Sequence, residues 1–302
     1  MKSLIIISII SLCISSDQAK YSGGIGEPNN PYLIYTAEHL NAIGIEPNDW
    51  DKHFELMADI DLSGYSYDRA VIAPDINESE NSFQGTSFTG TFDGNDHVIR
   101  NLHIRGGGYL ALFGRLAAGA KISNLGLGAV NIEGAGDYAG AFVGEISDWS
   151  VFLTNCYSTG IVTGHGNIGG LVGDNSFGSI AASYSSCKVT GDSVVGGLLG
   201  SNSGSDVMSG GILVNCYSIG TVTGQNTVGG LVGRNGGIIT ASHSTGRIDA
   251  TSARVGGLVG DHYGSITISY STGSVDGDSS VGGLVGYHSQ GSTVACYSRG
   301  VV

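Results

Sequence analysis

A five-residue run, GGLVG or a close variant, recurs along this chain and is its strongest constraint on folding. Consecutive copies end 27, 33, 27 and 26 residues apart, at Gly173, Gly200, Gly233, Gly260 and Gly286. Two degenerate copies lie upstream, YLALFG ending at Gly114 and YAGAFVG ending at Gly144. A second motif, typified by NCYSTGIVTG from Asn155, follows each copy from Gly144 onward. Self-similarity at a period of 20–50 residues indicates a solenoid, a propeller or an array.

The residue types in the repeats select among these architectures. Short runs of β-branched residues are broken by Gly, Ser, Thr and Asn, which is typical of strands and turns and not of helical repeats. A propeller blade needs about 40–45 residues, whereas a unit of 26 or 27 suits one turn of a parallel β-helix. The predicted fold class is all-β, a parallel β-helix of about seven to eight stacked turns with an N-terminal cap.

Two columns of apolar residues are predicted to fill the interior, because one turn alone cannot bury its apolar face. One column is the residue before each Gly pair: Ile168, Val195, Val228, Val255 and Val281. The other is the leucine within each copy: Leu171, Leu198, Leu231, Leu258 and Leu284. The Gly pairs are predicted to adopt positive φ at a corner and to allow close approach between turns.

The cysteines and the aromatic residues of the repeats also fall in columns. Cys156, Cys216 and Cys296 share one column, but no two lie in adjacent turns, and Cys187 lies elsewhere on its turn. A disulfide needs closer neighbours, so buried free thiols are predicted. A structural ladder is predicted for the aromatic column of Tyr157, Tyr184, Tyr217, His243, Tyr270 and Tyr297.

The GGLVG and CYSTGxVTG units resemble GLUG-motif repeats of bacterial secreted and surface proteins, including adhesin-like chains. The resemblance covers about residues 109–302, and the motif recurs at least five times. Upstream segments such as FTGTFDGNDHVIRNLHIRG resemble the region that precedes such repeats in exported β-helix proteins. The resemblance implies a right-handed β-helix at the cell surface or outside the cell. It does not imply that the protein is an enzyme.

Three regions are predicted along the chain. Residues 1–19, with Lys2 before a short apolar run, have the pattern of a secretory signal peptide. Residues 20–95 are predicted to form the N-terminal cap and the first irregular turns, with Thr36 as the N-cap of a short helix that ends at Gly44. Residues 96–302 are predicted to form the repeats of the solenoid, and the chain ends within a repeat.

Charge and motifs exclude several function classes. The net charge of −13 and the lack of a basic stripe argue against nucleic acid as a partner. No segment after the N-terminus is apolar and long enough to span a membrane. No HExxH, GxSxG, P-loop or paired CxxC motif is present, which argues against the common peptidase, hydrolase and nucleotide-binding classes.

Two groups of polar residues are candidates for chemistry. Asp59 and Asp61 lie on one face of a predicted strand and could serve as acid and base or bind Ca²⁺, but turn chemistry and solvated edges explain them more simply. His262 and His288 continue a column of Asn residues, and two imidazoles are too few for a tight metal site. The sequence therefore predicts an amide-type ladder, no metal and no cofactor.

The turn after each GLVG run varies in length, and insertions collect on faces that tolerate or use them. This edge is predicted to carry exposed aromatic and apolar side chains that contact a glycan or a protein. The candidate binding residues are Trp149, Phe177, Met208, Tyr263 and Tyr287.

The function predicted from these observations is that of a secreted or cell-surface β-solenoid, a structural or adhesin-like binding module without enzymatic activity. The alternative is a carbohydrate-active β-helix enzyme, a polysaccharide lyase or glycosidase. An ice-binding solenoid is a weaker third hypothesis, because the column of Thr163, Thr190 and Thr223 changes to Asp249 and Asp276. Because the final repeat leaves strand edges open, two hypotheses follow: the polypeptide continues beyond Val302, or this end associates with another chain, for example by end-to-end self-association.

Overall fold

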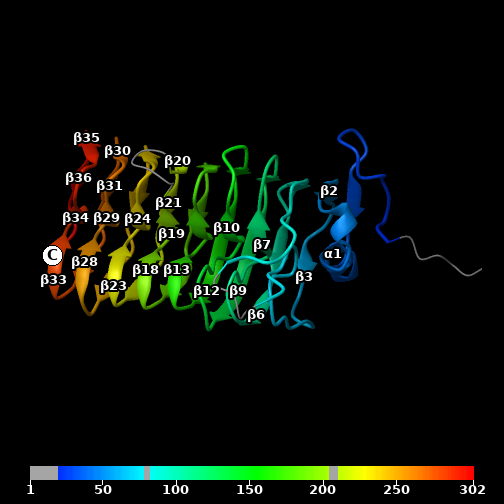
Figure 1. The fold of residues 1–302 in the computed structure, drawn as a ribbon, viewed down its shortest axis with the longest axis horizontal. Coiled ribbons are helices and arrows are strands. Elements are labelled where there is room, and N and C mark those ends of the chain that lie inside the picture. Colours follow the sequence, from blue (N-terminus) through cyan, green and yellow to red (C-terminus); the bar gives the residue numbers. More distant parts are fainter. Residues whose placement is uncertain (1–19, 78–81, 204–209) are drawn as a thin grey trace, which may run out of the picture.

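The chain winds into a parallel β-solenoid of about 7 turns. The computed structural model describes residues 20–77, 82–203 and 210–302, so the predicted signal peptide lies outside the described residues. Figure 1 shows the turns stacked in a row from the blue N-terminal end to the red C-terminal end. The predicted all-β fold class is confirmed.

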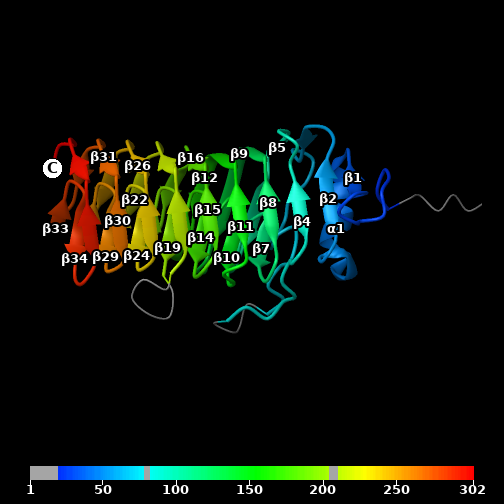
Figure 2. The ribbon, with the colours of Figure 1, turned by 90° about the horizontal axis from the view of Figure 1, so that it is seen from above.

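Four parallel sheets run along the solenoid axis (Figure 2). The ten-strand sheet comprises β1 (Tyr32–Ile34), β2 (His53–Leu56), β4 (Thr91–Asp93), β8 (Lys121–Ser123), β11 (Phe152–Thr154), β15 (Ser179–Ala181), β20 (Ile212–Val214), β25 (Ile238–Thr240), β30 (Ser265–Thr267) and β35 (Ser292–Val294). The seven-strand sheet comprises β7 (Phe113–Leu116), β10 (Val143–Ile146), β14 (Val172–Asn175), β19 (Leu199–Asn202), β24 (Val232–Asn235), β29 (Val259–His262) and β34 (Val285–His288).

The fourteen-strand sheet is the largest and the most irregular of the four. It comprises β3 (Ile60–Asp61), β5 (Val98–Arg100), β6 (His103–Gly106), β9 (Gly126–Gly134), β12 (Tyr157–Thr163), β16 (Tyr184–Ser185), β17 (Lys188–Thr190), β21 (Tyr217–Ser218), β22 (Val222–Gly224), β26 (His243–Ser244), β27 (Ile248–Ala250), β31 (Tyr270–Ser271), β32 (Val275–Asp276) and β36 (Tyr297–Ser298). The five-strand sheet comprises β13 (Gly166–Gly169), β18 (Ser193–Gly196), β23 (Asn226–Gly229), β28 (Ala253–Gly256) and β33 (Ser279–Gly282).

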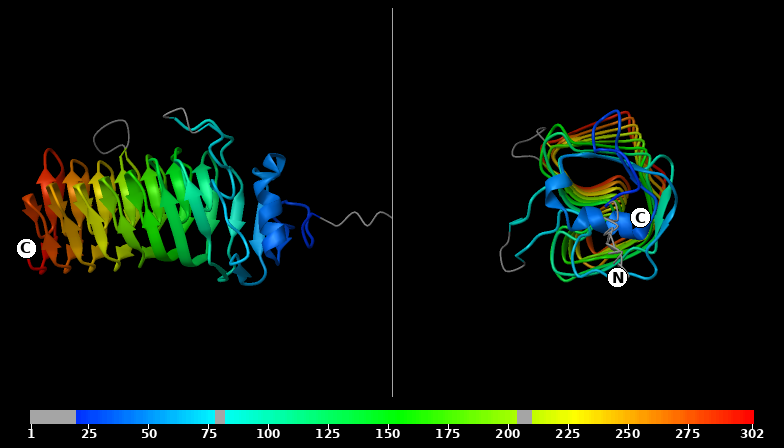
Figure 3. Two further views of the ribbon diagram at one scale, coloured as in Figure 1. Left: turned by 90° about the horizontal axis from the view of Figure 1, so that it is seen from below. Right: turned by 90° about the vertical axis from the view of Figure 1, so that its right-hand side faces the viewer.

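A short helix closes the N-terminal end of the solenoid, as predicted. Helix α1 (Ala37–Gly44) begins after Thr36, whose side chain accepts a hydrogen bond from the His39 backbone N–H. The 3₁₀ helix η1 (Pro47–Asp49) follows it. Leu40 and Ile43 of α1 are fully buried, and Figure 3 shows the helix lying across the opening of the coil. The helix thus supplies the apolar cover that the first open turn needs.

The apolar columns fill the interior of the solenoid as predicted. Leu171, Leu198, Leu231 and Leu258 are each 0% exposed, and so are Ile168, Val195, Val228 and Val255. Equivalent residues pair directly in the parallel register, for example Ile168 with Val195 and Val195 with Val228. The last members, Val281 and Leu284, are only partly buried because they lie in the last turn that the structure describes. Identical side chains stacked one above the other therefore form one continuous core.

The glycines of GGLVG are required because other atoms of the chain approach them closely at three places. A Cβ at Gly169 would lie 2.0 Å from the Val172 carbonyl oxygen, and one at Gly170 would lie 2.1 Å from the Ser185 hydroxyl. A Cβ at Gly200 would lie 2.4 Å from the carbonyl carbon of Asn167 in the five-strand sheet. The third glycine thus lets the five-strand sheet lie directly against the seven-strand sheet.

The prediction of positive φ at the Gly pairs is wrong. Positive φ falls instead on the residue two positions before each pair, with φ of 49–62° at Asn167, Val194, Thr227, Arg254 and Ser280. A second such column precedes each cysteine or its serine equivalent, and includes Asn155, Ala182 and Asn215. L-residues pay a small conformational penalty there, which the stacking of identical turns offsets.

The free thiols, the aromatic ladder and the amide ladder agree with the sequence predictions. All four described cysteines are free, and three of them are buried. In the aromatic ladder, successive ring centroids lie 4.7–5.2 Å apart at interplanar angles of 3–8°. Inside the coil, Asn175 donates to Asn202 at 3.0 Å and Asn202 donates to Asn235 at 2.8 Å. His262 continues this amide ladder, 3.2 Å from the Asn235 amide nitrogen.

Candidate functional site

The predicted binding residues do not converge on one spot. Trp149 is 77% exposed on the turn after β10, whereas Phe177 and Tyr263 are partly buried on equivalent turns. Tyr287 lies within β34, where the Arg254 guanidinium carbon is 4.8 Å from its ring centroid. Met208 lies outside the described residues. The variable turns thus offer separated side chains, and Trp149 is the most accessible of those described.

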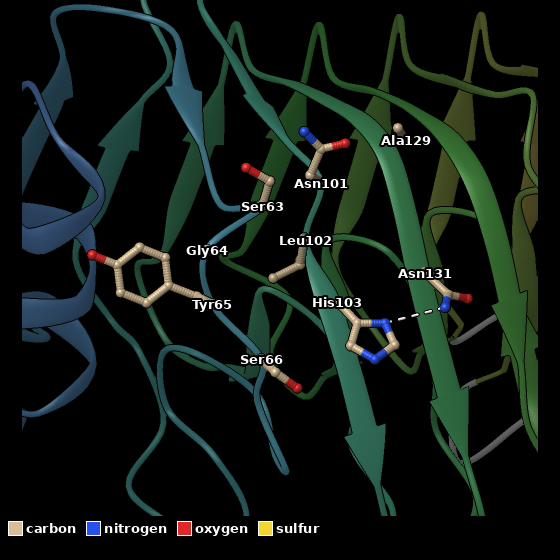
Figure 4. Close-up of a pocket in the computed structure, with 9 residues that line it drawn as sticks. All are labelled: Ser63, Gly64, Tyr65, Ser66, Asn101, Leu102, His103, Ala129 and Asn131. Atoms are coloured by element: carbon tan, nitrogen blue, oxygen red, sulfur yellow. Dashed lines mark hydrogen bonds between the residues drawn. The ribbon is translucent and has the colours of Figure 1, made fainter.

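A shallow depression near the N-terminal end gathers more polar groups than this edge. We call it the polar groove (Figure 4). Adjoining hollows are lined by residues of β6, β9 and the loop after β3, among them Ser63, Tyr65, Ser66, Tyr67, Asp68, Asn101, His103, Arg105, Asn131 and Glu133. Such a concentration of polar side chains around two tyrosines makes the groove the candidate site.

The floor of the polar groove is built from the outward positions of β6 and β9. His103 pairs in register with Asn131, and Arg105 pairs with Glu133. The Asn131 amide nitrogen lies 3.1 Å from His103 Nδ1 and also 3.1 Å from Glu133 Oε1. The Arg105 Nε is 3.7 Å from Glu133 Oε2. Because Ile104 and Ile132 point inward, their polar neighbours must all face the groove.

The wall of the polar groove is the loop that follows β3, which the helix holds in place. Tyr65 donates its hydroxyl hydrogen to Glu38 at 2.8 Å, and Tyr67 donates to Asn41 at 2.7 Å. The two rings stack at 6.4 Å between centroids with an angle of 15°. Burial raises the pKa of Tyr67 to about 12, so its hydroxyl remains protonated at neutral pH. Anchoring by α1 therefore fixes both rings before any ligand binds.

The carboxylates Asp59 and Asp61 lie on one exposed face, as the strand pattern predicted, but both are already engaged. Asp59 accepts a hydrogen bond from the Val98 backbone N–H, which lowers its pKa. Asp61 accepts one from the Asn101 side-chain amide, which lowers its pKa as well. Both are therefore ionised at neutral pH, so neither is poised to donate a proton as a general acid.

Carboxyl groups with raised pKa values lie elsewhere, in what we call the charged column of the seven-strand sheet. Its members pair in register on the outer side of the sheet: Arg115, Glu145, Asp174, Ser201, Arg234, Asp261 and Tyr287. Burial raises the pKa of both Glu145 and Asp174. Since Asp174 is only 6% exposed, a polymeric substrate has no access to it.

The polar groove was not predicted from the sequence. Its floor has a period-two signal in the segment NLHIRG, where His103 and Arg105 alternate with buried Leu102 and Ile104. Its wall carries no repeat signal, because residues 62–68 reach β6 only through the fold. Across the described ranges, no group of three or more His, Cys, Asp or Glu is arranged to hold a metal ion.

Comparison with known proteins identifies the repeats. The GLUG motif family matches residues 224–249, which confirms the resemblance of these repeats to that family. Halomucin of Haloquadratum walsbyi is 34% identical over 162 residues, and a candidate Gly-rich membrane protein of Evansella cellulosilytica is 35% identical over 134 residues. The matches cover 50% and 43% of this chain but only 2% and 15% of the two relatives.

Two solved structures share the solenoid shape. A candidate immunoglobulin A1 protease from Bacteroides ovatus has a TM-score of 0.65 at 22% identity, over 90% of this chain and 87% of that one. An IgA1 protease has a TM-score of 0.65 at 20% identity, over 86% of this chain and 21% of that one. At these identities the likeness shows the fold alone. No helix in residues 20–77, 82–203 or 210–302 has the length and apolar character to span a bilayer.

Proposed function

We propose that this solenoid of GLUG repeats is an extracellular, adhesin-like module that binds a glycan in the polar groove. The names of its relatives, halomucin and a Gly-rich membrane protein, support a location at or outside the cell surface. One observation carries the proposal: two anchored tyrosines stand beside a row of planar polar side chains.

The chemistry of the groove suits a sugar. Sugar hydroxyls donate and accept hydrogen bonds at once, and the groove offers donors and acceptors in His103, Asn131, Arg105 and Glu133. The C–H face of a pyranose ring is apolar and packs on an aromatic side chain such as Tyr65. Because the fold already holds these side chains in place, little conformational entropy is lost on binding.

The variable-turn edge supports a second contact in the same proposal. Trp149, at 77% exposure, is an anchor of the size that dominates binding to proteins and glycans. Phe177, Tyr263 and the strand residue Tyr287 extend this candidate surface along the solenoid axis. Replacing Trp149 with Ala is expected to weaken binding to a partner that uses this edge.

An enzyme is the second candidate, favoured by the shape shared with the two IgA1 protease structures. The carbohydrate-active alternative needs one carboxyl as acid and another as base. Incubation with immunoglobulin A1 and with a polysaccharide panel tests both activities. New peptide fragments, reducing ends or unsaturated products that vanish in Asp59→Asn or Asp61→Asn would overturn the binding-module proposal.

A glycan array followed by titration calorimetry tests the groove. His103→Ala and Asn131→Ala are each expected to weaken the affinity for the bound glycan by about tenfold, since each removes a central polar contact. Lys188→Ala is the matched control, because Lys188 occupies the same outward column two turns further along. The groove assignment fails if no glycan on the array binds, or if the control weakens binding as much as the groove variants do.

A further inference from the structure

One side of the solenoid has six equivalent segments, on consecutive turns, that contain no charged residue. Asp, Glu, Lys and Arg are all absent from residues 152–158, 179–185, 212–218, 238–244, 265–271 and 292–298. Arg299 directly follows the last of these segments, and its guanidinium carbon lies 5.3 Å from the Tyr297 ring centroid. These segments form the ten-strand sheet from β11 to β35 together with the aromatic ladder. The chain as a whole has a net charge of −13, so the lack of charged residues distinguishes this side from the rest of the chain. We call it the charge-free face.

The charge-free face presents hydroxyl, methyl and larger apolar groups. Leu153, Ile180 and Leu213 point into the core at 0% exposure, so the residues on either side of each point outward. One outward column consists of Phe152, Ser179, Ile212, Ile238, Ser265 and Ser292. The other consists of Thr154, Ala181, Val214, Thr240, Thr267 and Val294.

The aromatic ladder borders this face and repeats with the same step. Its rings lie 4.7–5.2 Å apart and cover one another, so a ligand reaches ring edges and hydroxyls instead of ring faces. In the described ranges, the hydroxyls of Tyr157, Tyr184, Tyr217, Tyr270 and Tyr297 make no hydrogen bond to the protein. The ladder therefore offers free hydroxyls at regular steps along the axis.

We propose that the charge-free face binds an extended, neutral, β-linked polysaccharide that lies parallel to the solenoid axis. Successive sugars in such an extended chain are flipped relative to one another, so an equivalent hydroxyl pattern recurs at every second sugar, close to every second turn of the solenoid. Covering a charged side chain with a neutral ligand costs desolvation without compensation, and this face has no such side chain. A charged polysaccharide would instead call for Lys or Arg here.

The composition of the face favours a polysaccharide over a second copy of the chain. The core of a protein interface is enriched in large aromatic residues, Met and Arg and depleted of Ser and Ala. The outward positions of the ten-strand sheet on this face mix Ser179, Ala181 and Ser265 with aliphatic side chains such as Ile212, and Phe152 is their one aromatic residue from β11 to β35. A repeating row of hydroxyls and methyls complements a repeating sugar surface better than an irregular protein surface.

Sedimentation with microcrystalline cellulose and with chitin powder tests this proposal. The test variant is Ala181→Lys/Val214→Lys, which places two charges on adjacent turns of the face. The matched control is Thr190→Lys/Thr223→Lys, which adds the same charges to the same two turns in the fourteen-strand sheet. The face variant is expected to lose about tenfold in affinity for at least one of the two solids, and the control is expected to match the wild type.

A second variant separates hydroxyl contacts from folding. Tyr184→Phe/Tyr217→Phe keeps the stacked rings and removes two hydroxyls, so a decrease of about threefold in affinity with unchanged thermal stability is expected. Failure of the wild type to bind either solid would overturn the proposal, and so would equal losses in the face variant and its control. A wild-type dimer that Ala181→Lys/Val214→Lys dissociates would show that a second copy covers the face. His103→Ala reports on the polar groove alone and should leave sedimentation unchanged.

Discussion

The charge-free face and the charged column are built from the same repeats on the same backbone, yet they differ in what lies opposite them. The charged column faces the neighbouring five-strand sheet, where Arg254 reaches Asp261 at 2.9 Å and stacks on Tyr287. On the charge-free face, by contrast, outward side chains such as Phe152, Ile212 and Val294 are exposed. The repeats thus place charges where another part of the chain can pair with them, and leave them out of the open face.

The largest expected effect comes from separating the two sheets that enclose the charged column. Gly200→Ala would place a Cβ 2.4 Å from the Asn167 carbonyl carbon, so the sheets must move apart. We expect a loss of about 3 kcal/mol in the free energy of unfolding, measured by urea denaturation. Gly64→Ala is the control, since nothing lies within 4 Å of its Cβ. Equal stability of the two variants would contradict the close packing of the sheets.

The next largest effect tests whether the ion pairs of the charged column stabilise the fold. Asp261 is 7% exposed and lies 2.9 Å from Arg254 and 3.8 Å from Arg234. Asp261→Ala leaves both cations without their partner, and we expect a loss of about 2 kcal/mol, reduced from the value for fully buried pairs because the arginines are partly exposed. Ser265→Ala, on the charge-free face, is expected to cost less than about 0.5 kcal/mol. Similar losses at the two positions would remove the distinction between the faces.

The regular part of the fold was predictable because the number of residues between copies of the repeat shows which residues stack on one another. The columns of Leu171 and Ile168, the free thiols, the aromatic ladder and the amide ladder all follow from counting residues between copies. Features that depend on contact between different sheets were not predictable. Positive φ at Asn167, for example, arises where the five-strand sheet turns toward the seven-strand sheet. The same limit applies to the polar groove, whose wall at residues 62–68 has no repeated equivalent.

A smaller effect concerns the acidic members of the charged column. Burial raises the pKa of Asp174 above its value in the unfolded chain, so the folded state binds the proton more tightly. This contribution to stability is present at low pH and is lost as the pH rises through the raised pKa. Asp174→Asn is therefore expected to raise the melting temperature at pH 7 by a few degrees, and by less at pH 4. Calorimetry across this range measures the difference, and a gain that grows on acidification would contradict the assignment.

The smallest expected effect arises at the one titratable imidazole within the aromatic ladder. His243 stacks between Tyr217 at 5.0 Å and Tyr270 at 4.7 Å, and burial lowers its pKa. The unfolded chain then binds a proton more readily, so this contribution to stability is lost as the pH falls below about 6.5. His243→Tyr, which restores the residue of the neighbouring turns, is expected to weaken the decline of the melting temperature between pH 7 and pH 5. Because a protonated imidazole would also bring a charge into the middle of the charge-free face, the same variant should bind a neutral polysaccharide equally well at both pH values. A steeper decline in His243→Tyr than in the wild type would mean that the imidazolium is stabilised by its tyrosine neighbours, and that this face tolerates charge.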